Sequence, residues 1–482
     1  MTTMLNWLTK RADLSPDHDA VVLPDDTTYS FKELYDHSTT MAHFLQQKGI
    51  KYGDHVAVMS PNQYRFIVTI HALNMIGAVS FLLNSRLSRS EIAFQLDDGD
   101  VSAVILDEQY RDQVDHQNVI AIDACDLEES VAFQPISIDL ETTAHVLYTS
   151  GTTGQPKGVQ LTYGNHWWNA NGSALNLGLY PHDRWLLSLP MFHVGGLSIV
   201  YRSVIYGIPI HLHDTFDVHA IHRDIMERGV TIMSAVSVML DQLLERLGGE
   251  RYPEHFRCML LGGGPAPEPL LNQAKTKEVP VYQTYGMTET ASQFSTLDDD
   301  NALDKLGSAG KPLFPNQLLI VHEGESLPAN QVGEIMVKGP SVTSGYYKRE
   351  AETAEKLEYG WLKTGDLGYL DDDGFLFVVD RRKDLIISGG ENVYPAEIES
   401  VLKGHPDVID VGVVGQTDSR WGQVPVAFIV SGKPVEDLDL DAYSHAHLAK
   451  YKVPKAWYDI DELPRNAAKK LLRHQLQARL GE

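Results

Sequence analysis

The chain has 482 residues, of which 43% are apolar and 22% are charged. This composition is typical of a globular protein with about three folding units, or of one large body with an appendage, and it excludes disorder, collagen and coiled coil. The formal net charge of −25 argues against binding to nucleic acid or to an anionic membrane through bulk charge.

The number of cysteines and the N-terminal sequence indicate the cellular compartment of the protein. The sequence contains two cysteines, Cys125 and Cys258. They exclude a disulfide framework and a multi-thiolate metal site, and they favour a reducing compartment. Residues 1–13 predict a short amphipathic helix and not a signal peptide. No uncharged apolar run approaches the roughly 18 residues that a membrane span needs, so we expect a cytoplasmic protein.

Short apolar runs alternate with amphipathic stretches through the first 300 residues. The stretches predict helices over 30–47, 64–75, 217–228 and 236–247, and the runs predict buried strands over 55–59, 101–106, 145–148, 257–261 and 281–284. Strands that alternate with helices of this length predict doubly wound α/β layers. In such layers, ligands bind at the carboxyl ends of the strands.

The pattern changes after about residue 305. Runs separated by Asp-Gly or Glu-Gly turns predict small antiparallel units with strands over 318–323, 333–338 and 375–379. A new pattern after Arg382 predicts a helix over 395–402 and strands over 408–414 and 425–430. The charged run 380–384 is either a solvated turn or a boundary. We expect an N-terminal domain over 1–380, a hinge over 381–384 and a C-terminal domain over 385–482.

The strongest local signal is a glycine-rich loop, Tyr148-Thr-Ser-Gly-Thr-Thr-Gly-Gln-Pro-Lys-Gly158. Glycines let backbone N–H groups approach a phosphate, hydroxyl groups add donors, and Lys157 adds a point charge. A Walker A motif needs Gly before the lysine and Ser or Thr after it, whereas Pro156 and Gly158 stand there. The alternative is a mobile polar turn. We expect phosphate contacts from Thr149, Ser150, Gly151, Thr152, Thr153 and Lys157.

Five further motifs follow in order, and with the loop they resemble the signatures of the adenylate-forming superfamily, which contains acyl-CoA synthetases, adenylation domains and luciferases. They span 262–267, 283–290, 360–366, 380–392 and 464–473. The resemblance implies a large N-terminal domain of doubly wound sheets with a small β-subdomain, and a small mobile α+β C-terminal domain. It also implies a two-step reaction. A carboxylate attacks the α-phosphate of ATP to form acyl-AMP, and coenzyme A then displaces AMP.

The resemblance assigns a nucleotide site. Tyr285 offers a flat face for adenine, and Gly263, Gly264 and Pro265 form the opposite wall. Thr288 bonds the α-phosphate, and Glu289 holds Mg²⁺, which favours carboxylate and phosphate oxygens. Asp366 and Arg381 contact the ribose. The site is completed by Thr284, Gly286 and Met287.

The C-terminal motifs imply a domain that moves. Lys470 matches the lysine that bridges the attacking carboxylate and the phosphate, and Lys383 matches the hinge. Lys469 stands where glycine is usual, so one of two adjacent lysines has to be chosen, and without the motif the pair reads as a solvated surface feature. Gly389 and Gly390 would let the slim pantetheine arm of coenzyme A pass.

A further set of residues bears on which carboxylic acid is the substrate. His193 and Gly262 match positions that border the acyl pocket. Segments 164–168, 202–207, 307–314 and 450–454 resemble the 2-succinylbenzoate–CoA ligase branch of menaquinone biosynthesis. The implied substrates are 2-succinylbenzoate, ATP and coenzyme A. The alternatives are a ligase for another aryl or medium-chain acid, a carrier-protein adenylation domain, and a nucleotide-binding regulator without chemistry. A homo-oligomer is left open.

Overall fold

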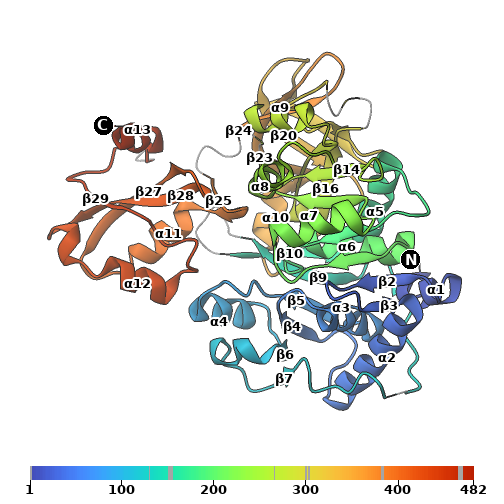
Figure 1. Cartoon of the computed structure of the whole chain (residues 1–482). Coiled ribbons are helices and arrows are strands. Elements are labelled where there is room, and N and C mark those ends of the chain that lie inside the picture. Colours follow the sequence, from blue (N-terminus) through green and yellow to red (C-terminus); the bar gives the residue numbers. More distant parts are fainter. Residues whose placement is uncertain are drawn as a thin grey trace.

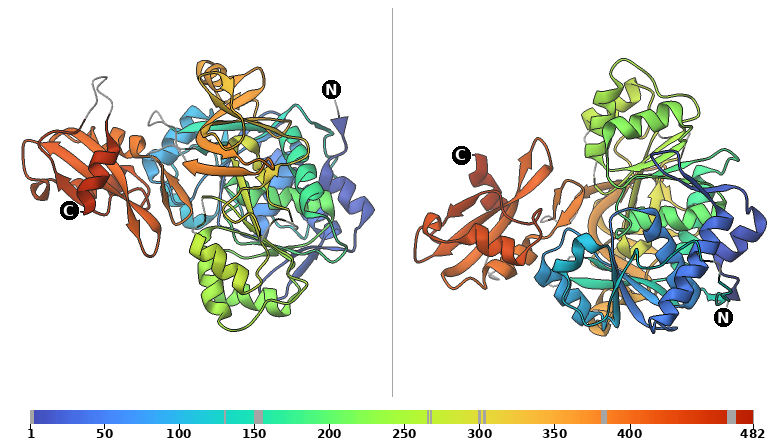
Figure 2. Two further views of the ribbon diagram at one scale, coloured as in Figure 1. Left: turned by 90° about the horizontal axis from the view of Figure 1, so that it is seen from above. Right: turned by 60° about the horizontal axis from the view of Figure 1, so that its bottom comes forward.

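The computed structural model describes residues 3–129, 131–149, 156–264, 266, 268–298, 301, 304–380, 385–464 and 471–481. Figure 1 shows a large body, which contains the N-terminus, and a smaller body, which contains the C-terminus. Both views in Figure 2 keep the smaller body to one side of the larger one.

The first layer of the large body is a seven-stranded sheet in the order β21-β10-β9-β5-β4-β6-β7. The strands from β9 to β7 are parallel, whereas β10 and β21 are antiparallel to their neighbours. Helices α3 (Tyr64–Ile76) and α4 (Arg89–Asp98) connect β4, β5 and β6. The strands are β4 (His55–Met59), β5 (Val79–Leu82), β6 (Ala103–Leu106), β7 (Val119–Ala121), β9 (Thr143–Thr149), β10 (Lys157–Thr162) and β21 (Gly345–Tyr346).

The second layer is a nine-stranded sheet in the order β17-β16-β15-β14-β13-β11-β12-β2-β3. Its strands are β2 (Asp19–Val22), β3 (Thr28–Ser30), β11 (Trp185–Leu187), β12 (Ile210–Leu212), β13 (Ile232–Ala235), β14 (Cys258–Leu261), β15 (Val281–Met287), β16 (Ser292–Thr296) and β17 (Lys311–Pro312). The helices of this part are α1 (Trp7–Leu14), α2 (Phe31–Gln47), α5 (Tyr163–Leu177), α6 (Val194–Tyr206), α7 (Val218–Glu227), α8 (Ser237–Leu247) and α9 (Glu268–Thr276). A short pair, β1 (Thr3–Met4) and β8 (Ile138–Asp139), lies apart from both sheets.

Local sequence signals explain where several helices begin. In α2, the hydroxyl of Ser30 accepts from the N–H of Glu33, and the carboxylate of Glu33 accepts from the N–H of Ser30. Helix α4 begins with the same reciprocal pair, Ser88 and Glu91. Both pairs satisfy N–H groups that the first turn of a helix leaves without a partner.

A small β-subdomain completes the large body. It is a six-stranded sheet of β18 (Gln317–His322), β19 (Glu325–Ser326), β20 (Gly333–Lys338), β22 (Leu357–Glu358), β23 (Trp361–Leu370) and β24 (Leu376–Asp380), with helix α10 (Glu350–Lys356) beside it. All of its strand pairs are antiparallel. The alternation of buried and partly exposed residues along β20 and β23 is typical of a sheet with one covered face.

The small body is an α+β unit with its own core. Its sheet contains β25 (Ile386–Ser388), β26 (Glu391–Val393), β27 (Val408–Asp418), β28 (Gly422–Ser431) and β29 (Trp457–Asp459). Its helices are α11 (Pro395–Leu402), α12 (Leu440–His447) and α13 (Arg473–Ala478). Buried Ile398, Val413 and Ile429 belong to one hydrophobic cluster of this unit.

The fold class predicted from the sequence is confirmed. Strand β4, strand β20 and helix α11 have the predicted bounds, and the other predicted elements differ by a few residues at their ends. The helix predicted over 1–13 is α1, which begins only at Trp7. Among the strands, the largest differences are at β15, which continues for three residues beyond the prediction, and at β27 and β28. Pairing with the neighbouring strand extends these elements, and a single segment does not contain that information. Within the described residues, no helix is long and apolar enough to cross a membrane.

Candidate active site

A cavity of about 370 Å³, lined by described residues of both bodies, lies where the large body meets the small one. Ala235, Gly262 and Met287 line it from the carboxyl ends of the parallel strands β13, β14 and β15. The opposite side is formed by the hairpin of β25 and β26. This is the place that the doubly wound layers predict for a ligand.

The cavity brings together most of the described residues that the motifs single out. They come from six separate stretches of the chain, namely Thr149, Lys157, His193, Gly262, Gly263, Thr284, Gly286, Met287, Thr288, Glu289, Asp366, Gly389 and Gly390. Segments more than 200 residues apart therefore share one space. Their assignment to particular parts of a ligand stays a prediction.

Tyr285 and Gly264 lie on a smaller cavity beside the first. Thr284 lines both cavities. The hydroxyl of Tyr285 donates to Oδ2 of Asp366 at 2.8 Å, and both side chains are buried. This bond ties the end of β15 to β23. The bond also holds the Asp366 carboxylate at the edge of the large cavity.

Two contacts to carboxylates, one from a tyrosine and one from a lysine, organise the side of the cavity near the glycine-rich loop. The hydroxyl of Tyr346 donates to Oε1 of Glu289 at 2.9 Å. Lys157 forms an ion pair with Glu352 of helix α10, and its side chain is buried. Residue 157 begins β10, so the loop joins two antiparallel strands. A Walker A loop instead leads from a strand into a helix.

Gly286 allows a close approach of backbones at the turn into β16. A Cβ atom at Gly286 would lie 1.9 Å from the carbonyl oxygen of Ser292, far inside any real contact. Glycine is therefore required at this position if β15 and β16 are to pair as they do. This close pairing positions Met287, Thr288 and Glu289 on the cavity wall.

His193 lies at the start of helix α6 on a turn that Asn62 holds in place. The Nδ2 of Asn62 donates to the carbonyl oxygens of Leu189 at 2.9 Å and of His213 at 3.3 Å. Its Oδ1 accepts from the N–H of Met191 at 3.0 Å. Asn62 is buried, so these bonds form away from water and fix the turn firmly. The side chain of His193 remains 45% exposed and lines the cavity.

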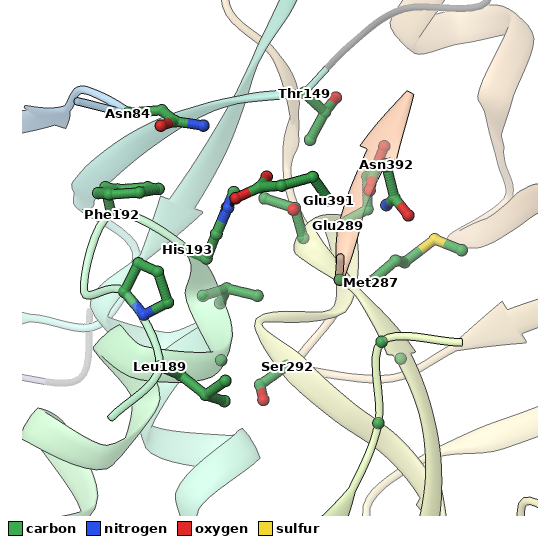
Figure 3. A pocket seen from close by; sticks show the side chains of 18 of the residues that line it. Asn84, Thr149, Leu189, Phe192, His193, Met287, Glu289, Ser292, Glu391 and Asn392 are labelled. Atoms are coloured by element: carbon green, nitrogen blue, oxygen red, sulfur yellow. Dashed lines mark hydrogen bonds and ion pairs between the residues drawn. The ribbon is translucent and has the colours of Figure 1, made fainter. Parts of the chain in front are cut away.

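Glu391 of strand β26 extends from the small body into the cavity. Figure 3 shows its carboxylate turned toward the ring of His193. Oε2 of Glu391 lies 2.9 Å from Nε2 of His193, and Oε1 accepts from Nη1 of Arg86 at 2.6 Å. Burial would raise the pKa of Glu391, but His193, Arg86 and Lys452 outweigh it and lower the pKa to about 2. The carboxylate is therefore ionised at neutral pH and joins the two bodies.

The hairpin that carries Glu391 turns at two glycines in left-handed conformations. Gly389 has φ +59° and Gly390 has φ +86°. A Cβ atom would lie 2.8 Å from the ring of Trp421 at Gly389, and 3.3 Å from Val236 of the large body at Gly390. Both the backbone conformation and the available space therefore favour glycine here.

Several predicted site residues lie outside the described residues, namely Ser150, Gly151, Thr152, Thr153, Pro265, Arg381, Lys383, Lys469 and Lys470. Their roles stay predictions. The described residues Pro464 and Leu471 flank the segment that carries the two lysines. Figure 1 shows helix α13, which begins at Arg473, on the side of the small body away from the large one.

Sequence reasoning missed residues that connect the two bodies. Glu391 lies inside a recognised motif, yet no role follows from the motif itself. Arg86 lies in a segment that carries no motif, and so does Asn62, which holds the turn before His193 within the large body. The sequence also did not predict the two ion pairs of Lys452, with Glu91 and with Glu397, each at 2.7 Å. The capping pair of Ser88 and Glu91 was a visible signal, but it indicates only a helix start.

Two family models match the chain. The model of the AMP-binding enzyme matches residues 8–347, and the model of the AMP-binding enzyme C-terminal domain matches residues 397–470. The chain is 51% identical to the 2-succinylbenzoate–CoA ligase of Bacillus cereus over 486 residues, with 100% of both chains covered. It is 52% identical to the ligase of the same name from Geobacillus kaustophilus over 481 residues, which covers 99% of this chain and 98% of the relative.

Solved structures of the same enzyme family also match this chain, and two of them differ in how closely they superpose on it. A double mutant of o-succinylbenzoate CoA synthetase from Bacillus subtilis, bound with its product analogue, superposes with a TM-score of 0.94 at 47% identity over 99% of both chains. The Bacillus subtilis enzyme in complex with its acyl-adenylate intermediate gives 0.77 at 46% identity and the same coverage. This chain therefore resembles the product-analogue complex more than the acyl-adenylate complex.

The matches extend over both bodies of the molecule, and the first family model alone covers more than two thirds of the chain. The first model contains β13, β14 and β15 of the cavity wall, and the full-length relatives also cover β23 and the β25–β26 hairpin, which lie between the two models. This chain belongs to the family of AMP-binding enzymes.

Proposed function

We propose that this chain is an ATP-dependent 2-succinylbenzoate–CoA ligase that works through an acyl-AMP intermediate. Full-length relatives with this name at 51% and 52% identity support the proposal. The cavity supports it as well, because it joins the nucleotide-site motifs to a hairpin of the smaller body. The substrates are then 2-succinylbenzoate, ATP and coenzyme A.

In the first step, a carboxylate oxygen of the acid attacks the α-phosphorus of ATP. The bond from that phosphorus to the pyrophosphate oxygen breaks, and acyl-AMP forms. A carboxylate is already ionised at neutral pH, so the step needs alignment and charge neutralisation and no general base. We assign Thr288, Lys157 and Lys470 to the phosphates. Thr288 and Lys157 line the cavity.

In the second step, the thiolate sulfur of coenzyme A attacks the acyl carbonyl carbon. The bond from this carbon to the AMP oxygen breaks, AMP leaves, and the thioester forms. The observation that carries the proposal is the contact of Glu391 with His193 and Arg86. It seats the β25–β26 hairpin against His193. We assign this side of the cavity to the acyl group, and the pantetheine arm would then arrive between the hairpin glycines and His193.

A magnesium ion fits the residues of this site. Glu289 lines the cavity, and Tyr346 holds its Oε1 in place. Among the described residues, no group of three or more His, Cys, Asp or Glu side chains has the arrangement of a metal site. One carboxylate is sufficient when phosphate oxygens and water supply the other ligands, which is the usual setting of Mg²⁺. When bound, the ion neutralises charge on the phosphates, and Glu289 is the residue that holds it.

The experiment that tests the proposal is a pyrophosphate-release panel with ATP and Mg²⁺. The acids are 2-succinylbenzoate, substituted benzoates and medium-chain fatty acids, each with and without coenzyme A. We expect release with 2-succinylbenzoate and formation of its CoA thioester. A clear preference for another acid would show that this acid, and not 2-succinylbenzoate, is the substrate. Binding of ATP without pyrophosphate release would overturn the enzyme assignment.

Lys470→Ala separates the two steps. We expect it to abolish acyl-AMP formation and largely to spare thioester formation from supplied acyl-AMP, because the ammonium acts on the phosphate only in the first step. Lys469→Ala is the matched control and should be milder. Equal loss of both steps in Lys470→Ala would contradict this division, and the reverse ranking would move the role to Lys469.

A further inference from the structure

The small body docks on the first turn of helix α4 as well as on the cavity. Figure 1 shows α4 beside α12 of the small body. The hydroxyls of Ser88 and Ser90 donate to the carbonyl oxygen of His447, at 3.1 and 3.3 Å. His447 ends α12, so the positive end of one helix dipole meets the negative end of the other.

Glu91 accepts hydrogen bonds from both bodies at this contact. Its Oε2 accepts from the N–H of Ser88 at 2.7 Å, which is the capping bond of its own helix. Its Oε1 accepts from Nζ of Lys452 of the small body at 2.7 Å. The capping pair therefore starts a helix and also presents a carboxylate to the other body.

Lys452 bridges two carboxylates in a site that excludes water. Its Nζ also donates to Oε1 of Glu397 at 2.7 Å. The side chains of Lys452, Glu397 and Glu91 are 4%, 5% and 9% exposed. Burial would lower the pKa of Lys452, but Tyr451 and the two carboxylates raise it above its ordinary value. The ammonium is therefore charged in the docked arrangement.

The three charges divide unequally between the two bodies. Lys452 and Glu397 both belong to the small body, so their ion pair persists wherever that body moves. Oε2 of Glu397 has no hydrogen-bond partner among the described residues, and Lys452 is its stabilising contact. Glu91 belongs to the large body, so its bond to Lys452 exists only in the docked arrangement.

We propose that Glu91 is a positioning residue for thioester formation. It recognises Lys452 and so selects the arrangement in which the β25–β26 hairpin faces the cavity. The proposal rests on the proposed two-step function. A buried carboxylate opposite a buried ammonium favours one docking geometry strongly, because any other arrangement has to rehydrate both charges. Glu91 does not line the cavity and so does not touch the reacting atoms.

The test uses the full-length chain and measures the two steps separately. Glu91→Gln keeps the capping bond, since glutamine also serves at this position of a capping box, and removes the charge. We expect it to slow thioester formation from supplied acyl-AMP by at least about tenfold and to leave acyl-AMP formation within about twofold. Lys452→Met should slow thioester formation further, because Glu91 and Glu397 then face each other in a buried site.

Helix α2 offers a matched control. Glu33 forms the same capping pair with Ser30, at 2.7 and 3.2 Å, and none of its hydrogen bonds with described residues reaches the small body. We expect Glu33→Gln to leave both steps unchanged. The inference is overturned if Glu91→Gln behaves like Glu33→Gln, or if it lowers both steps alike.

A second readout does not depend on activity. Phe314 and Ile409 are 87% and 70% exposed, and they lie on the large and the small body. Dyes on cysteines introduced at these positions report the arrangement by energy transfer. We expect Glu91→Gln to lower the docked population in the absence of substrates. An unchanged population would refute the positioning role, whereas absence of acyl-AMP formation in the wild type would refute the proposed function instead.

Discussion

Glu391 shows how one side chain acquires a role from partners distant in sequence. It lies within a glycine-rich motif of the small body, and its carboxylate reaches His193 and Arg86 of the large body. Each partner is more than 190 residues away along the chain. The pKa of this carboxyl is about 2, below its ordinary value of 4.5. Docking therefore stabilises the ionised form.

The sign of this shift predicts a pH dependence. The contribution of Glu391 to docking is complete above about pH 5 and is lost as the pH falls from 4.5 toward 2, because the proton then competes with His193 and Arg86. We expect Glu391→Gln to slow thioester formation by about tenfold or more, since a charge-assisted pair becomes a neutral contact. In a His193→Asn background, where Arg86 still pairs with Glu391, the ratio of the rates without and with Glu391→Gln, measured on supplied acyl-AMP, should stay constant between about pH 5.5 and 8. A ratio that changes steeply within this range would contradict the prediction.

The β25–β26 hairpin is the element on which the second step depends in the proposed function. Two left-handed glycines form its turn, and Val236 of the large body lies 3.3 Å from the position of a Cβ at Gly390. The turn between β23 and β24 provides a comparison. Gly374 there has a similar φ, +82°, and nothing lies within 4 Å of its Cβ position.

Alanine at these two glycines separates backbone strain from docking. Gly374→Ala and Gly390→Ala should each lower the free energy of unfolding by about 1–2 kcal/mol, because an L-residue is strained in the left-handed region. Gly390→Ala alone should also slow thioester formation by about tenfold, because its methyl group displaces the hairpin from Val236. Thermal unfolding and single-turnover rates measure the two effects. Equal rates in both variants would show that the hairpin does not approach this closely during the reaction.

At the scale of the whole molecule, the arrangement of the two bodies resembles that of a product-analogue complex. The TM-score is 0.94 with the Bacillus subtilis enzyme bound to its product analogue and 0.77 with the enzyme bound to its acyl-adenylate. Arg86 with Glu391 and Glu91 with Lys452 are two ion pairs that join the bodies in this arrangement. Because the acyl-adenylate complex superposes less well on this chain, we expect the proposed first step to use a second arrangement of the two bodies.

The ligands should shift the balance between the two arrangements. With dyes at the positions of Phe314 and Ile409, we expect ATP and 2-succinylbenzoate without coenzyme A to move the transfer efficiency away from the value of the docked arrangement. Coenzyme A, added with a non-reactive acyl-AMP analogue, should move it back. The control contains ATP and an unrelated acid in place of 2-succinylbenzoate. One unchanged efficiency in all conditions would exclude a rotation of the small body as part of the cycle.

Motifs and alternation in the sequence predicted the α/β class, the positions of a subset of the helices and strands, and 13 of the residues that line the cavity. They succeeded because a strand, a capped helix or a glycine-rich turn is built from contacts between near neighbours, and such contacts leave a local pattern. Helix α11 and strand β20 show this, since their bounds agree with the prediction. Strand β15 was predicted too short, because its last residues are paired by β16 and have no apolar pattern of their own.

The sequence by itself determined the elements and the kinds of group available for binding a nucleotide. Only the tertiary structure decided which distant groups meet, as with Asn62 and the turn before His193, or Glu91 and Lys452. The physical reason is that a long-range ion pair or hydrogen bond requires one suitable atom on each side and imposes no periodicity on the chain around it. Its partners become recognisable only when packing has placed them within about 3 Å of each other and away from water.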